Sequence, residues 1–406
     1  MLVDAQRWRA EFPALAQTVN GHPLAYLDSA STAQKPRAVI DATRRAYEKE
    51  CANVHRAVHT LGGAATELYE GVRERVRGFL NAGDAGEIVF TRGATEAINL
   101  VAWSFGKTVV GPGDEVLASE IEHHSNLVPW QMLCAERGAK LRAIPVDDTG
   151  QLDLARFKEM LSPKVKIVAV THVSNALGTV VPVEQVIAAA QAAGAAVVVD
   201  GAQAVPHLPV DVRALGCDFY CFSGHKLFGP TGTGVLYGKA ERLREMPPWQ
   251  GGGSMILSVS FDHTVYSEPP QRFEAGTPNI AGIVGLGAAI DFVEGIGQGA
   301  IGAWEHELVR YATDTLSGVP GLRWIGTAER KAAILSFVLG KIHPHDVATV
   351  LDHEGVAVRA GHHCAEPAVR RFGVGGTVRA SFALYNTPAE VDALARGLRR
   401  AVELFA

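Results

Sequence analysis

Short apolar runs alternate with helix-compatible segments over residues 85–240 of the chain. The runs are rich in β-branched and aromatic residues and read EIVFT, DEVLAS, KLRAIPV, KIVAVTHV, AAVVVD, DFYCFS and GVLYG. Segments such as VEQVIAAAQAAG between them favour helices. This alternation predicts an α/β fold in which helices cover both faces of a largely parallel sheet. Ligands bind such sheets at the carboxyl ends of the strands, so polar residues that directly follow the runs are candidates for chemistry.

The pattern changes around residues 246–279, which are rich in Gly, Pro and Ser and predict a long connection that carries a hairpin. Beyond it we expect a helix over 281–317, strands near LRWIG, AAILSFVLG, VAVRAG and VRASFAL, and a final helix. Thr387 and Glu390 form a capping box at the start of that helix, with Pro388 at its first helical position. The carboxyl-terminal part is therefore expected to be a smaller α+β domain.

Composition narrows the class of protein. The 406 residues suffice for two domains, and an apolar content of 47% is that of a globular core. Acidic and basic residues nearly balance, at 43 against 38, and no basic run is long enough to follow a nucleic acid. No apolar run approaches the ~20 residues of a membrane span. The first segment, MLVDAQRWRAEFPALAQ, favours an amphipathic helix over a secretory signal, so we expect a cytoplasmic protein.

Polar side chains follow several of the predicted strands. Asp200 closes AAVVVD, Asn175 follows KIVAVTHV, and Lys226 follows DFYCFS in the segment FSGHKLFGPTG. A buried carboxylate needs a cation or a hydrogen bond, and a partly desolvated lysine has a lowered pKa that favours the neutral amine of a Schiff base. Residues 90–105, FTRGATEAINLVAWSF, place Gly and Thr95 where a helix start can bind an anion. An aldehyde-trapping lysine, a carboxylate and a phosphate site together indicate pyridoxal 5′-phosphate (PLP).

The motifs also carry a family resemblance. They are YLDSASTAQKP, NVHRAVHT, TRGATEAINLVA, IEHHSNLVPWQ, THVSNALGT, VDGAQAVPH, FSGHKLFGPTGTG, RFEAGTPN and RAGHHCAEP, and they span nearly the whole chain. In this order and spacing they resemble the SufS-like cysteine desulfurases, PLP enzymes of fold type I in the class-V aminotransferase family. The resemblance implies a large PLP-binding domain with a mostly parallel mixed sheet, and a smaller α+β domain formed by the chain termini. It places the domains at 1–25 (a helical segment packed on the small domain), 26–295 (with a hairpin near 251–272) and 296–406.

The resemblance assigns roles to individual residues. Lys226 binds the cofactor covalently, His123 stacks on its ring, and Cys364 is the nucleophile that receives sulfur. The other residues implied to bind the cofactor are Ala94, Thr95, Asn175, Asp200, Gln203, Ser223, His225 and, reaching in from a second subunit, Thr277. Arg379 and Arg359 would bind the substrate with Asn175, because a guanidinium suits a carboxylate better than an ammonium does.

The resemblance also implies partners. A homodimer follows if Thr277 completes the partner's site. The substrate would be L-cysteine, or L-selenocysteine, and the sulfur would pass to an acceptor protein of the SufE type or the zinc-bearing SufU type for iron–sulfur cluster assembly. His343 and His345 in GKIHPHDVAT are similar to residues of members that work with the SufU type, or they merely flank a helix start. The stretch AEPAVRRFGVGGT departs from the family pattern and would tune acceptor choice or loop mobility.

Cys364 admits two other interpretations. His362, His363 and Cys364 are all competent metal ligands, but neighbours in an extended loop point to opposite sides and no C-x-x-C or H-x-x-x-H completes a site, so no metal is expected. A buried inert thiol is disfavoured because Gly, His, Glu and Pro around it are typical of a loop. The alternatives for the whole chain are a selenocysteine lyase, an aminotransferase of the same fold, which needs no loop thiol, and an inactive scaffold.

Overall fold

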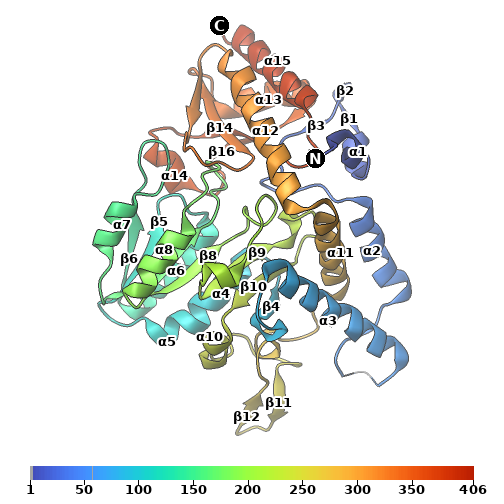
Figure 1. Ribbon diagram of the computed structural model, residues 1–406, viewed down its shortest axis with the longest axis vertical. Coiled ribbons are helices and arrows are strands. Elements are labelled where there is room, and N and C mark those ends of the chain that lie inside the picture. Colours follow the sequence, from blue (N-terminus) through green and yellow to red (C-terminus); the bar gives the residue numbers. More distant parts are fainter. Residues whose placement is uncertain (1–2, 57) are drawn as a thin grey trace.

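The computed structural model describes residues 3–56 and 58–406 (Figure 1). Residues 1–2 of the predicted amino-terminal helix and Ala57 of the NVHRAVHT motif lie outside the described residues.

A seven-stranded sheet forms the centre of the larger part of the molecule. Its strands are β4 (Ile88–Thr91), β5 (Glu115–Ser119), β6 (Lys140–Ile144), β7 (Val165–Thr171), β8 (Ala196–Asp200), β9 (Phe219–Ser223) and β10 (Gly234–Gly238). They lie in the order β4-β10-β9-β8-β7-β5-β6. The run from β6 to β9 is parallel, whereas β10 is antiparallel to both of its neighbours. The largely parallel sheet expected from the alternating pattern is confirmed.

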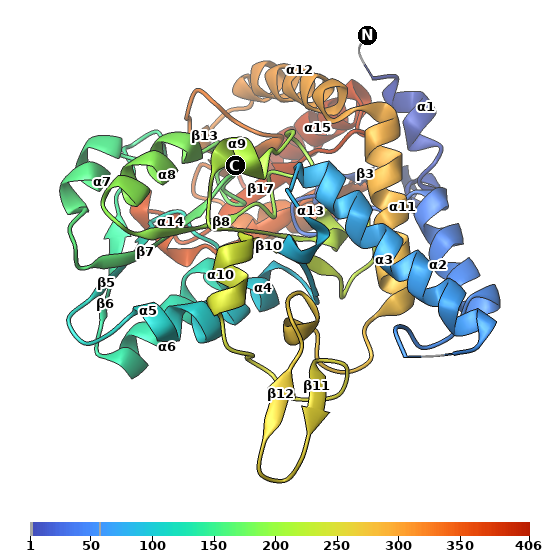
Figure 2. The ribbon, with the colours of Figure 1, turned by 60° about the horizontal axis from the view of Figure 1, so that its bottom comes forward.

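Helices cover both faces of this sheet (Figures 1 and 2). Alternate residues of β7 belong to separate apolar clusters, Val168 and Val170 on one face and Ile167 and Ala169 on the other. Helices whose side chains share the first cluster include α3 (Thr60–Leu80), α7 (Leu154–Met160), α8 (Val183–Ala192), α9 (Val212–Leu215) and α11 (Ile280–Ile296). Those sharing the second are α4 (Ala94–Val101), α6 (Val128–Arg137) and α10 (Ala240–Glu245). A π-helical turn joins α4 to the short α5 (Lys107–Val109).

The carboxyl-terminal part contains an antiparallel sheet in the order β13-β14-β17-β16. Its elements are α12 (Gln298–Ser317), β13 (Leu322–Ile325), β14 (Ile334–Leu339), α13 (Pro344–His353), β16 (Arg359–Gly361), α14 (Glu366–Arg371), β17 (Thr377–Ser381) and α15 (Pro388–Leu404). Apolar residues of α12, α13 and α15 form one cluster with the sheet. The capping box of Thr387 and Glu390 is confirmed at the start of α15. This sheet and its helices form the upper end of the molecule in Figure 1.

The amino-terminal segment packs against both parts. Its elements are α1 (Ala5–Arg9), β1 (Thr18–Val19), β2 (His22–Pro23), β3 (Ala25–Tyr26) and α2 (Arg37–Lys49). β3 pairs with β15 (Val356–Ala357), and Arg9 forms an ion pair with Glu390 of α15 at 2.8 Å. Trp8 packs edge-on against Phe292 of α11. The proposed division of the chain at residues 25 and 295 stays a prediction.

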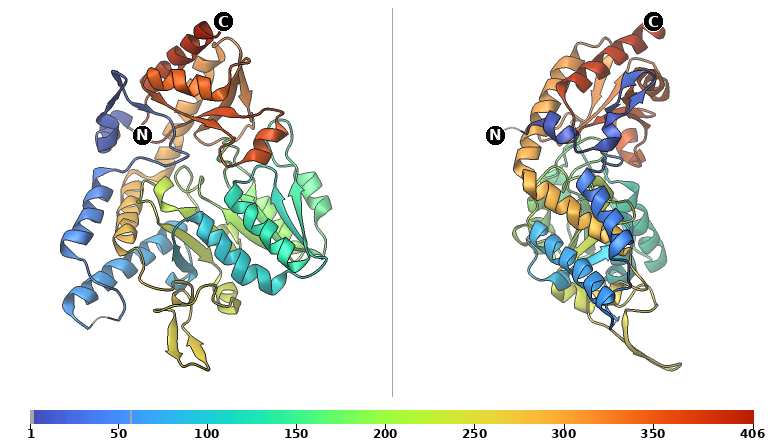
Figure 3. Two further views of the ribbon diagram at one scale, coloured as in Figure 1. Left: turned by 180° about the vertical axis from the view of Figure 1, so that it is seen from behind. Right: turned by 90° about the vertical axis from the view of Figure 1, so that its right-hand side faces the viewer.

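A hairpin of β11 (Ile256–Val259) and β12 (Thr264–Tyr266) projects from the body of the molecule (Figures 2 and 3). Within the described residues, no single helix is long and apolar enough to cross a membrane. The pair α11 and α12 has that length and composition only when taken together, and it is bent by 74°.

Three local expectations were wrong. The helix expected over 281–317 is two helices, because Gly297 adopts φ 92° between α11 and α12. The strand expected at VAVRAG is split between β15 and β16, which belong to different sheets. The amino-terminal helix is only five residues long, and Pro13 begins a separate 3-10 turn after it.

Candidate active site

A cavity of about 150 Å³ lies where the carboxyl ends of the parallel strands meet the loop between β16 and α14. All predicted site residues except Gln203, Thr277 and His343 line it. Those that line it are Ala94, Thr95, His123, Asn175, Asp200, Ser223, His225, Lys226, Arg359, Cys364 and Arg379. Residues from seven separate segments of the sequence thus meet in one place.

Lys226 and Asp200 are buried groups of opposite charge, and each shifts the pKa of the other. Burial, and then the positive charge of Arg379, lower the pKa of the Lys226 amine to about 8, while Asp200 opposes that shift. Asp200 ends β8 with only 5% of its surface exposed, and burial raises its pKa against the pull of Lys226. Its Oδ1 accepts a hydrogen bond from the Ala202 N–H at 2.9 Å. A lysine with this pKa has a substantial neutral fraction near neutral pH, as a reaction with an aldehyde requires.

The start of α4 forms an anion cradle beside this pair. The Ala94 N–H donates to Ser223 Oγ at 2.9 Å, and the Thr95 hydroxyl lies 2.6 Å from Ser125 Oγ. A β-carbon at Gly234 would lie 2.4 Å from the Gly93 α-carbon, so β10 approaches the cradle only because it carries glycine there. His225 Nδ1 is buried and has no hydrogen-bond partner among the residues that the structure describes. Unpaired N–H groups at a helix start, hydroxyls and this imidazole suit a phosphate.

His123 is held in one orientation by its own loop. Its Nδ1 accepts the Ser125 N–H at 3.0 Å and lies 2.9 Å from the Ser125 hydroxyl. Burial, followed by the charge of Lys226, lowers the pKa of His123 to about 3. The ring is therefore neutral near pH 7, and because Nδ1 is an acceptor, its proton lies on Nε2.

Two arginines converge on one hydroxyl. Arg379 Nη2 and Arg359 Nη1 donate to Ser31 Oγ at 2.7 and 2.8 Å. Arg379 also donates to Asp28 Oδ1 and to the Asn175 carbonyl, each at 2.9 Å. Its Nε is buried and finds no partner within residues 3–56 and 58–406. Burial lowers the pKa of Arg379, with Asp28 opposing. The pair offers donors for a carboxylate, and Ser31 determines where those donors lie.

The loop with the sequence HHC joins β16 to α14. Cys364 is half-buried at the cavity, which separates it from the buried Cys134, Cys217 and Cys221. Burial raises the pKa of each of those three thiols, so they are poor nucleophiles at neutral pH. Among residues 3–56 and 58–406 no cluster of His, Cys, Asp or Glu could hold a metal ion.

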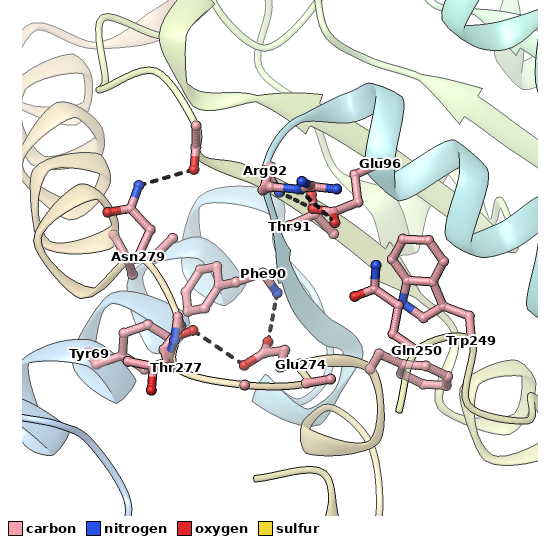
Figure 4. Close-up of a pocket in the computed structure, with 16 residues that line it drawn as sticks. Tyr69, Phe90, Thr91, Arg92, Glu96, Trp249, Gln250, Glu274, Thr277 and Asn279 are labelled. Carbon is pink, nitrogen blue, oxygen red and sulfur yellow. Dashed lines mark hydrogen bonds and ion pairs between the residues drawn. The ribbon is translucent and has the colours of Figure 1, made fainter. Parts of the chain in front are cut away.

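Three predicted residues lie elsewhere. Gln203 is buried nearby, and its Nε2 donates to the Ala30 carbonyl at 2.7 Å. Thr277 lines a separate pocket with Glu274, Gln250 and Trp249 (Figure 4). His343 is exposed at the start of α13, where its Nδ1 accepts the His345 N–H. His343 thus flanks a helix start, and its role toward a partner stays a prediction.

Sequence reasoning did not assign Ser31, Ser125 or His363, which also line the cavity. Ser31 lies in DSAST and Ser125 in HHSN. The Ser31 hydroxyl meets Arg359 and Arg379, which are distant in sequence, whereas the Ser125 hydroxyl meets both the neighbouring His123 and the distant Thr95. No spacing rule could have found the distant contacts.

The donor set fits PLP. A lysine of lowered pKa faces a buried carboxylate, and a helix start with two hydroxyls and an unpartnered imidazole lies within the same cavity. Lys226, Asp200 and the cradle around Ala94 are the residues that would hold it, and Arg379 remains for a substrate carboxylate.

Comparison with known proteins agrees with this geometry. The family model described as Aminotransferase class-V matches residues 25–394. A cysteine desulfurase of Serratia proteamaculans is 55% identical over 405 residues, covering 100% of both chains. The chain belongs to the cysteine desulfurases of the class-V aminotransferases. These are PLP-dependent enzymes with the fold-type I architecture seen here.

Other cysteine desulfurases support the same placement. One from Synechococcus elongatus is 55% identical over 397 residues, and the present chain covers 63% of its length. Solved structures of the Escherichia coli cysteine desulfurase CsdA and of a Thermococcus onnurineus cysteine desulfurase superpose with TM-scores of 0.93 and 0.94. These are 43% and 41% identical and are covered over 100% and 99% of both chains.

Proposed function

We propose that this cysteine desulfurase converts L-cysteine to L-alanine and leaves the sulfur as a persulfide on Cys364. The observation that carries the proposal is the placement of the Cys364 thiol in the cavity that also holds Lys226 and Arg379. An aminotransferase of the same fold needs the lysine and the arginine but no thiol.

Arg379 and Arg359 orient the substrate by its carboxylate. Their guanidinium groups already share Ser31 Oγ, so a carboxylate meets donors whose positions are fixed before binding. The substrate's sulfur is then directed toward the thiol loop.

Lys226 moves the first proton. With its pKa lowered to about 8, the Nζ amine is neutral often enough near pH 7 to take a proton from the substrate's α-carbon. PLP, when bound, would supply the electron sink for that carbanion, and Asp200 would pair with its ring nitrogen.

Cys364 then receives the sulfur. Its Sγ, as a thiolate, forms a bond to the substrate sulfur while the carbon–sulfur bond breaks, so the product is a Cys364 persulfide and the carbon fragment leaves as alanine after gaining protons. His123 lines the same cavity and carries its proton on Nε2, and we propose it as the donor that returns a proton.

Replacement of Cys364 by Ser tests the proposal. Alanine release from L-cysteine should be lost in the presence of a reductant, while the cofactor is still bound. Undiminished alanine release would rule out the persulfide role and leave PLP binding standing.

We further propose a homodimer in which Thr277 completes the site of the other subunit. In support, Thr277 lies outside the Lys226 cavity, in a pocket of about 510 Å³ on the surface (Figure 4). Mixed dimers of T277V and K226A should regain activity, because one site then has both residues intact. If Thr277 acted within its own chain, mixing would restore nothing.

The sulfur acceptor is proposed to be a protein of the SufU type, with iron–sulfur cluster assembly as the destination of the sulfur. The exposed His343 and His345 support this, since their rings stack at 5.4 Å and His343 keeps Nε2 free of the helix cap. A His343→Ala variant should lose stimulation by a SufU-type protein, whereas His345→Ala should keep it. Full stimulation of His343→Ala would overturn the assignment.

A further inference from the structure

The two histidines before Cys364 face opposite sides of the thiol loop. His362 is exposed, and its Nε2 lies 2.9 Å from the Gly375 carbonyl oxygen. His363 is only 4% exposed, and its Nε2 lies 2.7 Å from the Thr377 hydroxyl. The exposed ring of His362 and the buried ring of His363 therefore each link the thiol loop to residues at or just before the start of β17.

These contacts matter because part of the loop adopts an unfavourable backbone conformation. His363 and Cys364 have φ angles of 55° and 56°, so two successive residues with side chains adopt the left-handed conformation. This conformation persists where the surrounding structure holds it, and it is frequent at functional sites.

Three contacts from other elements hold these two residues. Asn175 Nδ2 donates to the His363 carbonyl at 2.6 Å, and the His124 N–H donates to the Cys364 carbonyl at 2.7 Å. Those two bonds fix main-chain atoms. The bond to Thr377 is the one that fixes a side chain, and it lies within the buried interior of the loop.

We propose that His363, held by the Thr377 hydroxyl, is a positioning residue that keeps Cys364 in the left-handed conformation from which its thiol reaches the substrate sulfur. Burial, and then the charges of Arg379 and Arg359, lower the pKa of His363 to about 3. The ring therefore stays neutral near pH 7, and its bond to Thr377 is kept over the working range.

Thr377 also relates the thiol to the carboxylate site. It lies two residues before Arg379 on β17, so both side chains leave the same face of one strand. The strand that places the carboxylate-binding arginine thus also places the thiol loop.

The inference rests on the proposed persulfide chemistry, and it is tested by comparing T377V with T377S in the PLP-loaded enzyme. Two rates are measured after L-cysteine is added: the change in cofactor absorbance, and the appearance of persulfide on Cys364. T377V should slow persulfide formation by about tenfold, the effect expected for one lost hydrogen bond. The absorbance change should stay within about twofold of the wild type, and T377S should restore the persulfide rate.

The variant His363→Asn removes the other partner of the same hydrogen bond and therefore tests the inference independently. Asn tolerates the left-handed conformation but is too short to replace the imidazole, so the same slow step is expected. Combining it with T377V should add no further loss, because both variants remove one interaction. Should T377V unfold, His363→Asn alone decides the outcome.

Persulfide formation at the wild-type rate in T377V or His363→Asn would overturn the inference. So would a double variant whose loss of rate is the sum of the two single losses. A variant that slows the absorbance change as much as persulfide formation would also contradict it. Failure of the proposed function has a different signature, because the wild-type enzyme itself would then form no persulfide on Cys364.

Discussion

The main-chain N–H of His124 donates a hydrogen bond to the carbonyl oxygen of Cys364 at 2.7 Å. The Glu366 N–H in turn donates to His124 Nε2 at 3.2 Å. The loop that carries His123 and the loop that carries the thiol are thereby joined, although about 240 residues separate them in the sequence. Because backbone atoms make the first bond, the spacing between His123 and Cys364 depends on how the loop after β5 packs against the loop between β16 and α14.

The lowered pKa of Lys226 predicts how the apoenzyme captures its cofactor. A neutral amine attacks the aldehyde of PLP, so the capture rate should rise tenfold per pH unit below about pH 8 and level off above it. Stopped-flow absorbance on apoenzyme, with K226A as the inactive control, measures this. A rate that keeps rising to pH 10 would mean that Lys226 titrates as an ordinary lysine.

Arg379 should affect substrate capture more than protein stability. Arg379→Lys keeps a charge but loses the fork that binds a carboxylate through two N–H groups, and we expect kcat/KM for L-cysteine to fall about 10- to 100-fold. Steady-state alanine release measures this effect. Arg400→Lys on the surface of α15 is the matched control, because its ion pair with Glu403 is exposed and should contribute nothing measurable. Equal effects of the two variants would contradict the assignment.

His123 should stay neutral throughout the physiological range in the cofactor-free protein. Burial lowers its pKa to about 3, and the Ser125 N–H occupies Nδ1, so nitrogen-15 NMR should show the Nε2–H tautomer unchanged between about pH 5 and pH 8. A His123→Asn variant assigns the signals. Titration of this ring near pH 6.5 would show that burial does not govern it.

Glu122, which precedes His123, makes stability depend on pH. It is buried, and its carboxyl accepts hydrogen bonds from Asn126 Nδ2 at 2.7 Å and from the Thr171 N–H at 2.8 Å. Burial raises its pKa from 4.5 to about 8. The folded form therefore keeps a proton that the unfolded chain releases, and this stabilisation is complete below pH 4.5 and is lost as the pH rises to about 8.

Glu122→Gln should remove that dependence. Between about pH 5 and pH 8, the unfolding temperature of the wild type should fall more steeply with pH than that of the variant. Differential scanning calorimetry measures both slopes, and Glu403→Gln on the exposed surface of α15 serves as the control. Parallel slopes in all three proteins would contradict a raised pKa of Glu122.

Much of the fold follows from local pattern. The seven central strands and the start of α15 follow from β-rich runs and a capping box, and the position of Asp200 at a strand end follows with them. The break at Gly297 was missed although Gly295, Gly297 and Gly299 lie close together there, a composition that indicates a helix end, and the left-handed φ of Gly297 produces the break. VAVRAG was divided between two sheets by its partners, because β3 is distant in sequence and β17 lies beyond a loop and a helix.

The residues of the candidate site also fall into those that the sequence could predict and those that it could not. Lys226 and Cys364 could be found by residue type and motif, since their chemistry is carried by their own side chains. Ser31 could not, because its importance comes from two arginines over 300 residues away that converge on one oxygen. The same holds for His363, whose partner Thr377 lies across a loop and a helix.

The most direct test of the central claim is the mass of the Cys364 peptide after the PLP-loaded enzyme has reacted with L-cysteine and been trapped with an alkylating agent. We predict one added sulfur atom on Cys364, together with an equal amount of alanine. Alanine release with no added sulfur on Cys364, or with the sulfur on another cysteine, would contradict the account.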